Sequence, residues 1–326
     1  MDRHGKSEGM TVLHSLEELS LLPGPVALAI GVFDGLHLGH QEVIQAALEH
    51  AHQHQGTAVV MSFEPHPLAV LRPESAPPRL CGPAYRRLLL ERLGVGCMLL
   101  CPFDENTAAT PAEMFLDTLT RDCRPLGCIS VGYGWTFGRN RGGNIHMLMA
   151  HGERQGFAVY GVPPVRVDGQ VVSSTLIRDA VAAGELGRAA CLLGREYALY
   201  GEVMHGRRLA HQLGFPTANV RPEAELLPPY GVYGVQVEVD GQMCSGVANL
   251  GIRPTVETGE ANPSLEVHLF DWSGDLYGRN LEVKLGDFIR PEQKFSGLEA
   301  LKKQVEADVI LARGLAEARA RGKNGC

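Results

Sequence analysis

The chain lacks several features that would narrow its function at once. Its 326 residues include 8 cysteines but no CxxC pair, which argues against a structural zinc site. No apolar run reaches the roughly 18 residues of a membrane-spanning helix. The first ten residues contain no apolar core of a secretory signal. We therefore expect a cytoplasmic protein that does not associate with a membrane.

Positive charge and the common phosphate-binding motifs are also scarce. The formal net charge is -7 at pH 7, and the pI is about 6.0. Nucleic-acid-binding proteins need a basic surface, so we expect no nucleic-acid partner. Neither the GxxxxGK motif of P-loop proteins nor the dinucleotide motif GxGxxG occurs. A nucleotide site in this chain must therefore use another arrangement.

The first part of the chain alternates two kinds of segment. Apolar runs at 25–33, 57–63, 97–103 and 127–133 predict buried strands, and the amphipathic segments between them predict helices. Continuous apolar strands separated by helices are typical of a parallel sheet covered on both faces. We therefore predict an α/β domain over residues 1–188.

The pattern changes near residue 195, where strand-like segments follow one another without helices. Val235, Val237 and Val239 alternate with polar residues, and Asp240-Gly241 is a tight-turn pair. The segment 297–320 has the composition of a helix. We therefore predict that residues 189–326 form an antiparallel sheet or small barrel with a terminal helix.

Two histidines follow the first predicted strand in GVFDGLHLGH, residues 31–40. The N-terminus of a helix at the carboxyl end of a parallel strand is a natural phosphate site. Gly35 and Gly39 remove side chains where a nucleotide comes close, and His37 and His40 would donate hydrogen bonds to phosphoryl oxygens. From the residues alone, a loop histidine and a helix cap remain an alternative explanation of the pair.

A second constellation lies in LGFPTANV, residues 213–220. Thr217 and Asn219 stand two apart in an extended segment, so their side chains face the same way. Hard oxygen donors suit Mg²⁺ held together with nucleotide phosphates, although a simple turn also explains the segment. Alternation places Glu266 and His268 on one face of a later strand. Glu282 has the same pattern, so periodicity does not single out a catalytic base.

The motifs GVFDGLHLGH, FEPHP, SSTLIR and PTAN together resemble those of the bacterial bifunctional riboflavin kinase/FMN adenylyltransferase family, also called FAD synthetases. The resemblance extends over residues 27–312. It implies a Rossmann-like nucleotidyltransferase domain of the HxGH type, followed by a β-barrel riboflavin kinase domain. The kinase would convert riboflavin to FMN with ATP and Mg²⁺. The first domain would join FMN to AMP from a second ATP, giving FAD and pyrophosphate.

The resemblance also implies roles for individual residues. His37, His40 and Arg178 would serve adenylyl transfer, and Glu266 would accept the proton of the riboflavin 5'-hydroxyl. Thr217 and Asn219 would hold Mg²⁺. Nucleotide contacts are expected from Gly31, Phe33, Asp34, Gly35, Gly39, Ser173, Ser174, Thr175, Gly206, His211, Gly214 and Pro216. Flavin contacts are expected from Phe63, Pro65, His66, Pro67, Trp135, Phe137 and Arg290.

Three positions depart from the family pattern. Gly134 stands in VGYGWTFG where the family carries Asn or Asp, Cys81 stands where it carries Thr, and His211 stands where it carries Arg. Loss of a polar side chain at Gly134 favours an alternative, a riboflavin kinase with a weakened or inactive adenylyltransferase domain. A flavin-binding module without activity is a further alternative, but a binder would not need the base Glu266. The oligomeric state is left open.

Overall fold

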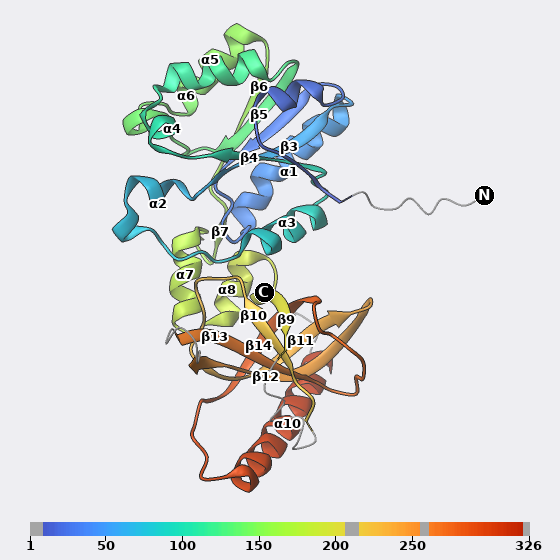
Figure 1. Ribbon diagram of the computed structural model, residues 1–326. Coiled ribbons are helices and arrows are strands. Elements are labelled where there is room, and N and C mark those ends of the chain that lie inside the picture. Colours follow the sequence, from blue (N-terminus) through green and yellow to red (C-terminus); the bar gives the residue numbers. More distant parts are fainter. Residues whose placement is uncertain (1–8, 206–214, 255–260, 322–326) are drawn as a thin grey trace, which may run out of the picture. The chain divides into compact units, whose positions relative to one another are not determined.

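The computed structural model describes residues 9–205, 215–254 and 261–321, which form two compact units (Figure 1). The first unit takes its described residues from Met1–Pro77 and Arg86–Ser173, and the second from Pro78–Tyr85 and Ser174–Cys326. Residues 174–188 thus pack with the second unit. A functional boundary at 188/189 stays a prediction. No helix in the described ranges is long and apolar enough to cross a membrane.

Six parallel strands form the sheet of the first unit, which confirms the predicted α/β class. Their order is β1-β4-β3-β2-β5-β6. The order changes direction between β2 and β5, and open α/β sheets bind ligands beyond the carboxyl ends of strands at such a point. The bounds are β1 Thr11–Leu13, β2 Val26–Ile30, β3 Thr57–Glu64, β4 Cys97–Pro102, β5 Leu126–Gly132 and β6 Ala158–Val162.

Helices cover both faces of this sheet, because the side chains of its central strands are apolar on both faces. Leu28 and Ile30 of β2 pack with Leu116 and Leu148 in one core. Ala29 belongs to the other face, and α1 packs along β2, β3 and β5. The helices are α1 Leu38–Gln53, α2 Pro67–Leu71, α3 Pro83–Arg92, α4 Glu105–Ala109, α5 Ala112–Asp122 and α6 Ile145–Gln155, with 3₁₀ turns η1 Glu17–Leu21, η2 Pro73–Ser75 and η3 Arg139–Arg141. A small hairpin, β7 Arg166–Val167 and β8 Gln170–Val171, follows β6.

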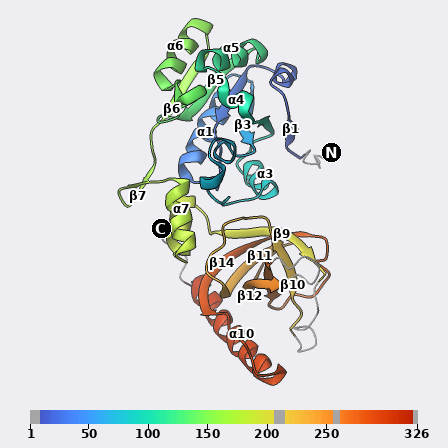
Figure 2. The same ribbon diagram turned by 60° about the vertical axis from the view of Figure 1, so that its left-hand side comes forward.

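The second unit is a closed barrel of six antiparallel strands (Figure 2), in the order β10-β13-β12-β11-β14-β9. Asp240 and Gly241 join β11 to β12 with φ of 52° and 79°, which confirms the predicted two-residue hairpin. The strand bounds are β9 Ala198–Met204, β10 Ala218–Pro222, β11 Gly231–Val239, β12 Gln242–Pro254, β13 Ala261–Leu269 and β14 Asn280–Pro291. Helices α7 Ser174–Ala182 and α8 Leu186–Leu193 precede the barrel.

The predicted terminal helix is also present, as α10 Leu298–Arg321. It packs on the barrel through a small core in which Ala312 meets Val232, Val247 and Phe270. Inside the barrel lie the apolar members of β13 that alternation predicted, Leu265, Val267 and Leu269. The polar residues between them are on the outer face of the strand.

Candidate active sites

His37 is the N-cap of α1, which begins at Leu38. Its Nδ1 accepts a hydrogen bond from the backbone N–H of His40 at 3.2 Å. Because this bond uses the lone pair of Nδ1, the proton of the neutral imidazole is carried by Nε2. A side-chain N–H donor therefore stands beside the helix N-terminus, where backbone N–H groups and the helix dipole favour an anion. The capping and phosphate-site interpretations are thus compatible.

His40 stacks on this cap. The two imidazole rings are 3.6 Å apart between centroids, with their planes 15° apart. Burial, followed by the charge of His37, holds the pKa of His40 well below its usual value. Its Nδ1 is buried and has no hydrogen-bond partner among the residues that the structure describes. His40 is therefore a neutral imidazole held against the cap of α1.

Most residues next to the cap are buried and pack around the two histidines. Phe33 is 1 % exposed, and its ring meets the edge of the His40 ring at 5.3 Å. Asp34 is also buried, and Gly35 has a φ of 79° that favours glycine. A Cβ on Gly39 would lie 3.3 Å from the ring of His37, so glycine lets the imidazole lie over the helix.

A cavity of about 880 Å³ lies at the carboxyl edge of this sheet. Gly31 and Val32 after β2 and Gly134 after β5 contribute to its wall, as expected at the change in strand order. Trp135 and Phe137 stack with ring centroids 4.6 Å apart. Arg72 and Arg141 also line the cavity. Its aromatic side chains are Phe63, Phe103, Phe115, Trp135 and Phe137.

The structure brings together part of the predicted flavin set. Phe63, Pro67, Trp135 and Phe137 line the cavity, whereas Pro65 and His66 do not. His66 instead caps α2, where its Nδ1 accepts the N–H of Leu68 at 3.0 Å. Four further residues of the cavity were not predicted. Phe103 and Phe115 lie outside the motifs, and Leu68 and Leu71 follow FEPHP in α2.

The segment SSTLIR forms the start of α7, as its capping pattern indicates. Ser173 belongs to the first unit, whereas Ser174, Thr175 and Arg178 belong to the second. The Nε of Arg178 donates to the carbonyl of Pro78, also in the second unit, at 2.9 Å. The phosphate-binding role of these residues stays a prediction.

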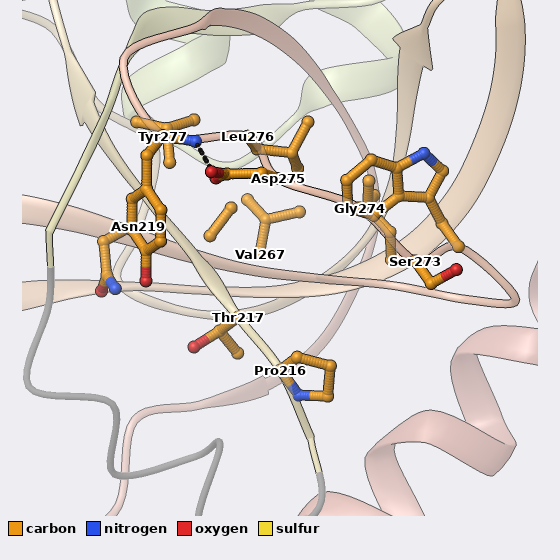
Figure 3. A pocket seen from close by; sticks show the side chains of 13 residues that line it. Pro216, Thr217, Asn219, Val267, Ser273, Gly274, Asp275, Leu276 and Tyr277 are labelled. Carbon is orange, nitrogen blue, oxygen red and sulfur yellow. Dashed lines mark hydrogen bonds between the residues drawn. The ribbon is translucent and has the colours of Figure 1, made fainter.

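The PTAN segment borders a pocket of about 430 Å³ in the second unit. Thr217 and Asn219 line it, and their polar ends point to the same side (Figure 3). This confirms the orientation predicted from their spacing. Pro216 also lines the pocket. The other predicted residues of this nucleotide site, Gly206, His211 and Gly214, lie outside the described residues.

The barrel register distinguishes the two candidate carboxylates. Glu266 of β13 pairs with Asn219 of β10 on one side and with Asn249 of β12 on the other. Directly opposed residues share one face of a sheet, with Cβ atoms about 5 Å apart. Glu266 is therefore next to one of the residues that border the pocket. Glu282 is on β14, which does not pair with β10 or β13.

Glu282 has a structural environment instead. It is 8 % exposed and accepts a hydrogen bond of 2.7 Å from the hydroxyl of Tyr85. The ring of Tyr85 stacks on Tyr200 at 5.4 Å between centroids. Burial raises the pKa of Tyr85, which keeps its hydroxyl protonated as a donor. Glu282 is thus part of a buried contact between residues 78–85 and the barrel of the same unit.

Two features of the second site were not predicted, the contact made by His268 and a loop that lines the pocket. His268 follows Glu266 on the same face, and its Nδ1 lies 2.9 Å from the carbonyl oxygen of Pro216, which ties β13 to the PTAN segment. The loop from Trp272 to Tyr277 also lines the pocket. Its Tyr277 N–H donates to Asp275 at 2.9 Å, the bond drawn in Figure 3. Alternation signalled the face of His268, but no signal in the sequence marked the loop.

Arg290, predicted to contact flavin, is engaged with α10. Its Nη2 lies 2.7 Å from a carboxylate oxygen of Asp308 and its Nε lies 3.0 Å from both oxygens. The side chains are 18 % and 6 % exposed. This buried ion pair holds α10 to the barrel. A flavin contact of Arg290 stays a prediction.

Comparison with known families gives two matches along the chain. The model of the FAD synthetase family matches residues 21–176, and that of the riboflavin kinase family matches residues 193–316. The first range contains His37 and the aromatic cavity. The second contains Thr217, Asn219 and Glu266.

Full-length relatives show both matches in one chain. A bifunctional riboflavin kinase/FMN adenylyltransferase of Pseudomonas fluorescens is 42% identical over 88% of this chain and 92% of its own length. One of Haemophilus influenzae is 37% identical over 93% of this chain and 98% of its own length. A crystal structure described as a macrolide-efflux protein from Streptococcus pneumoniae is 29% identical with a TM-score of 0.78, covering 97% of this chain and 100% of that chain.

Proposed function

Because the chain belongs to the family of bifunctional riboflavin kinase/FMN adenylyltransferases, we propose that each of its two activities uses one of the two cavities described above. The chain is a riboflavin kinase and an FMN adenylyltransferase, and it makes FAD. Both reactions use ATP. The kinase reaction is assigned to the barrel pocket, and adenylyl transfer to the α/β cavity and the cap of α1.

The observation that carries the kinase assignment is the register that sets Glu266 directly opposite Asn219. Glu266 accepts the proton of the riboflavin 5'-hydroxyl as that oxygen attacks the γ-phosphorus of ATP. The bond between the γ-phosphorus and the bridging oxygen breaks, and ADP leaves. His268 holds the PTAN segment in place through the carbonyl of Pro216.

Thr217 and Asn219 are the residues that would hold Mg²⁺. Their hydroxyl and amide oxygens are hard donors on one side of the pocket. Two protein oxygens are enough for this ion, because it keeps water and phosphate ligands. No cluster of three or more His, Cys, Asp and Glu in the described ranges could hold a metal instead. When bound, Mg²⁺ supplies charge neutralisation at the phosphates.

Adenylyl transfer needs positioning more than a base, because the attacking FMN phosphate is already an anion. Its oxygen attacks the α-phosphorus of ATP, and pyrophosphate leaves. The aromatic cavity takes the flavin ring, since planar ligands stack on such walls. Arg72 and Arg141 offset the FMN phosphate charge, whereas His37 and His40 at the start of α1 donate to the ATP phosphates.

The test of the kinase site compares two matched variants. Glu266→Gln should lower kcat for riboflavin phosphorylation about 10²- to 10⁴-fold, the range for loss of a general base. Binding of riboflavin and conversion of supplied FMN to FAD should be unchanged. Glu282→Gln, on a strand with the same alternation, should keep the kinase kcat. Full kinase activity of Glu266→Gln would contradict the mechanism.

A time course tests the balance between the two activities. The protein is incubated with riboflavin, ATP and Mg²⁺, and the flavins are separated by chromatography. We expect FMN to appear first and FAD later, because FMN is the product of the kinase step and the substrate of adenylyl transfer. FMN that accumulates without FAD would support the alternative of a weakened second domain. Riboflavin, FMN and ATP are the proposed substrates, and a cytoplasmic location stays a prediction.

A further inference from the structure

The loop between β2 and α1 is held in an unfavourable backbone conformation. Phe33, Gly35 and Leu36 have φ of 54°, 79° and 43°. Phe33 and Leu36 are bulky side chains, and each is 1 % exposed. Left-handed backbone is costly for such residues and persists only where the surroundings impose it. This loop also carries the His37 cap, so whatever holds the loop also places the histidine pair.

Contacts at both ends of the loop restrain it. At its start, the carbonyl oxygen of Val32 accepts a hydrogen bond of 3.1 Å from the hydroxyl of Ser62, which is 0 % exposed. The Nη1 of Arg86 lies 3.5 Å from the same oxygen. At its end, the side-chain amide of Gln41 donates to the carbonyl of Leu36 at 2.9 Å. Val32 is therefore held from β3 and from α3.

Arg86 connects this loop to the neighbouring strand. Its Nη2 lies 3.3 Å from a carboxylate oxygen of Glu64, the last residue of β3, and its side chain is 10 % exposed. Glu64 directly follows Phe63, whose ring lines the aromatic cavity, as Val32 does. One buried guanidinium thus spans the ends of β2 and β3 behind the cavity wall. A planar fork can contact two such points at once, whereas an ammonium group acts as a single point charge.

We propose that Arg86 is a positioning residue for FMN adenylyl transfer. It holds the end of β2, which leads to the histidine pair, in register with the end of β3, which carries the flavin wall. Loss of this link allows the strained loop to relax and moves His37 and His40 relative to the flavin. The inference rests on the proposed location of adenylyl transfer at these histidines. It does not place Arg86 in contact with substrate.

The principal test uses three variants of the full-length protein. Arg86→Met should lower kcat for FMN adenylyl transfer about 100-fold, the size of effect expected from a 1 Å misplacement, while the KM values change less than about threefold. Arg86→Lys should restore part of the rate. Riboflavin kinase activity of the same preparations should be unchanged. Arg87→Met is the matched control, because Arg87 lies next on α3 but pairs with Glu91 and Met10.

Several outcomes would overturn the proposal. One is an Arg86→Met protein whose adenylyl transfer falls no further than that of Arg87→Met. Another is an equal loss of both activities in a folded Arg86→Met protein, because a positioning role in the first unit should leave the kinase activity unchanged. If Arg86→Met does not fold, Ser62→Ala removes the other restraint on Val32 and should lower the same kcat. His37→Ala tests the proposed location of adenylyl transfer separately, since unchanged FAD formation in that variant would remove the proposed site itself.

Discussion

The buried ion pair between Arg290 and Asp308 gives a prediction that separates two roles of Arg290. The arginine was predicted to contact flavin, yet its guanidinium binds Asp308 on α10 through Nε and Nη2 at 2.7 to 3.0 Å. Asp308→Ala removes the carboxylate and leaves a positive charge in a site where the arginine side chain is 18 % exposed. Any flavin contact of Arg290 is left in place by this change.

The expected loss of stability follows from this burial. Breaking one side of a buried pair costs roughly 3 to 5 kcal/mol, and we expect about 3 kcal/mol because Arg290 retains some exposure. For a unit of this size each kcal/mol shifts the melting temperature by roughly 2 to 4 °C, so the second unit should melt roughly 6 to 12 °C lower. Loss of the carboxylate that accepts from Gln304 acts in the same direction.

The assay combines calorimetry of the full-length protein with the kinase activity that remains after heating. Because the kinase reaction is assigned to the barrel, loss of this activity identifies the unfolding transition of the second unit. Asp271→Ala is the matched control. Arg313 binds Asp271 at 2.7 Å and 2.9 Å, but the two side chains are 43% and 79% exposed, so the melting temperature should barely change. An unchanged melting temperature in Asp308→Ala would refute the anchoring role of Arg290.

Two further predictions concern the first unit. Gly134→Asn should fit, because a Cβ there meets nothing within 4 Å, and one added hydrogen bond should raise kcat/KM for FMN about 2- to 10-fold. Gly138→Ala should instead destabilise the folded protein, because Gly138 has a φ of 71° and a Cβ there would lie 2.5 Å from the backbone of Ala112. A lower kcat/KM in Gly134→Asn would contradict the first expectation. The pKa of His40 lies well below 6.5 when folded, so the unfolded chain binds more protons and stability should fall as the pH drops below about 6.5. Urea unfolding between about pH 8 and pH 5 measures this, His40→Asn should reduce the dependence, and stability that rises on acidification would argue against it.

Local pattern determined the elements of this protein. Apolar runs, capping residues and the Asp240-Gly241 pair each act within a few residues, so strands, helices and the hairpin could be predicted from the sequence. Alternation in β13 likewise placed Leu265 inside and Glu266 outside. The motifs also identified the family, because their residue types and spacing reflect chemistry that does not depend on distant contacts.

Only the tertiary structure decided the neighbours of residues that share the same local sequence pattern. Glu266 and Glu282 have the same local pattern, but the closed barrel pairs the first with Asn219 and buries the second under Tyr85. Arg86 lies in a helix that carries no motif, yet packing sets its guanidinium between the carbonyl of Val32 and the carboxylate of Glu64. Such neighbours are far apart in sequence, and strand order, register and chain packing bring them together. Local periodicity contains none of this information, because it is the same for every residue on a given face.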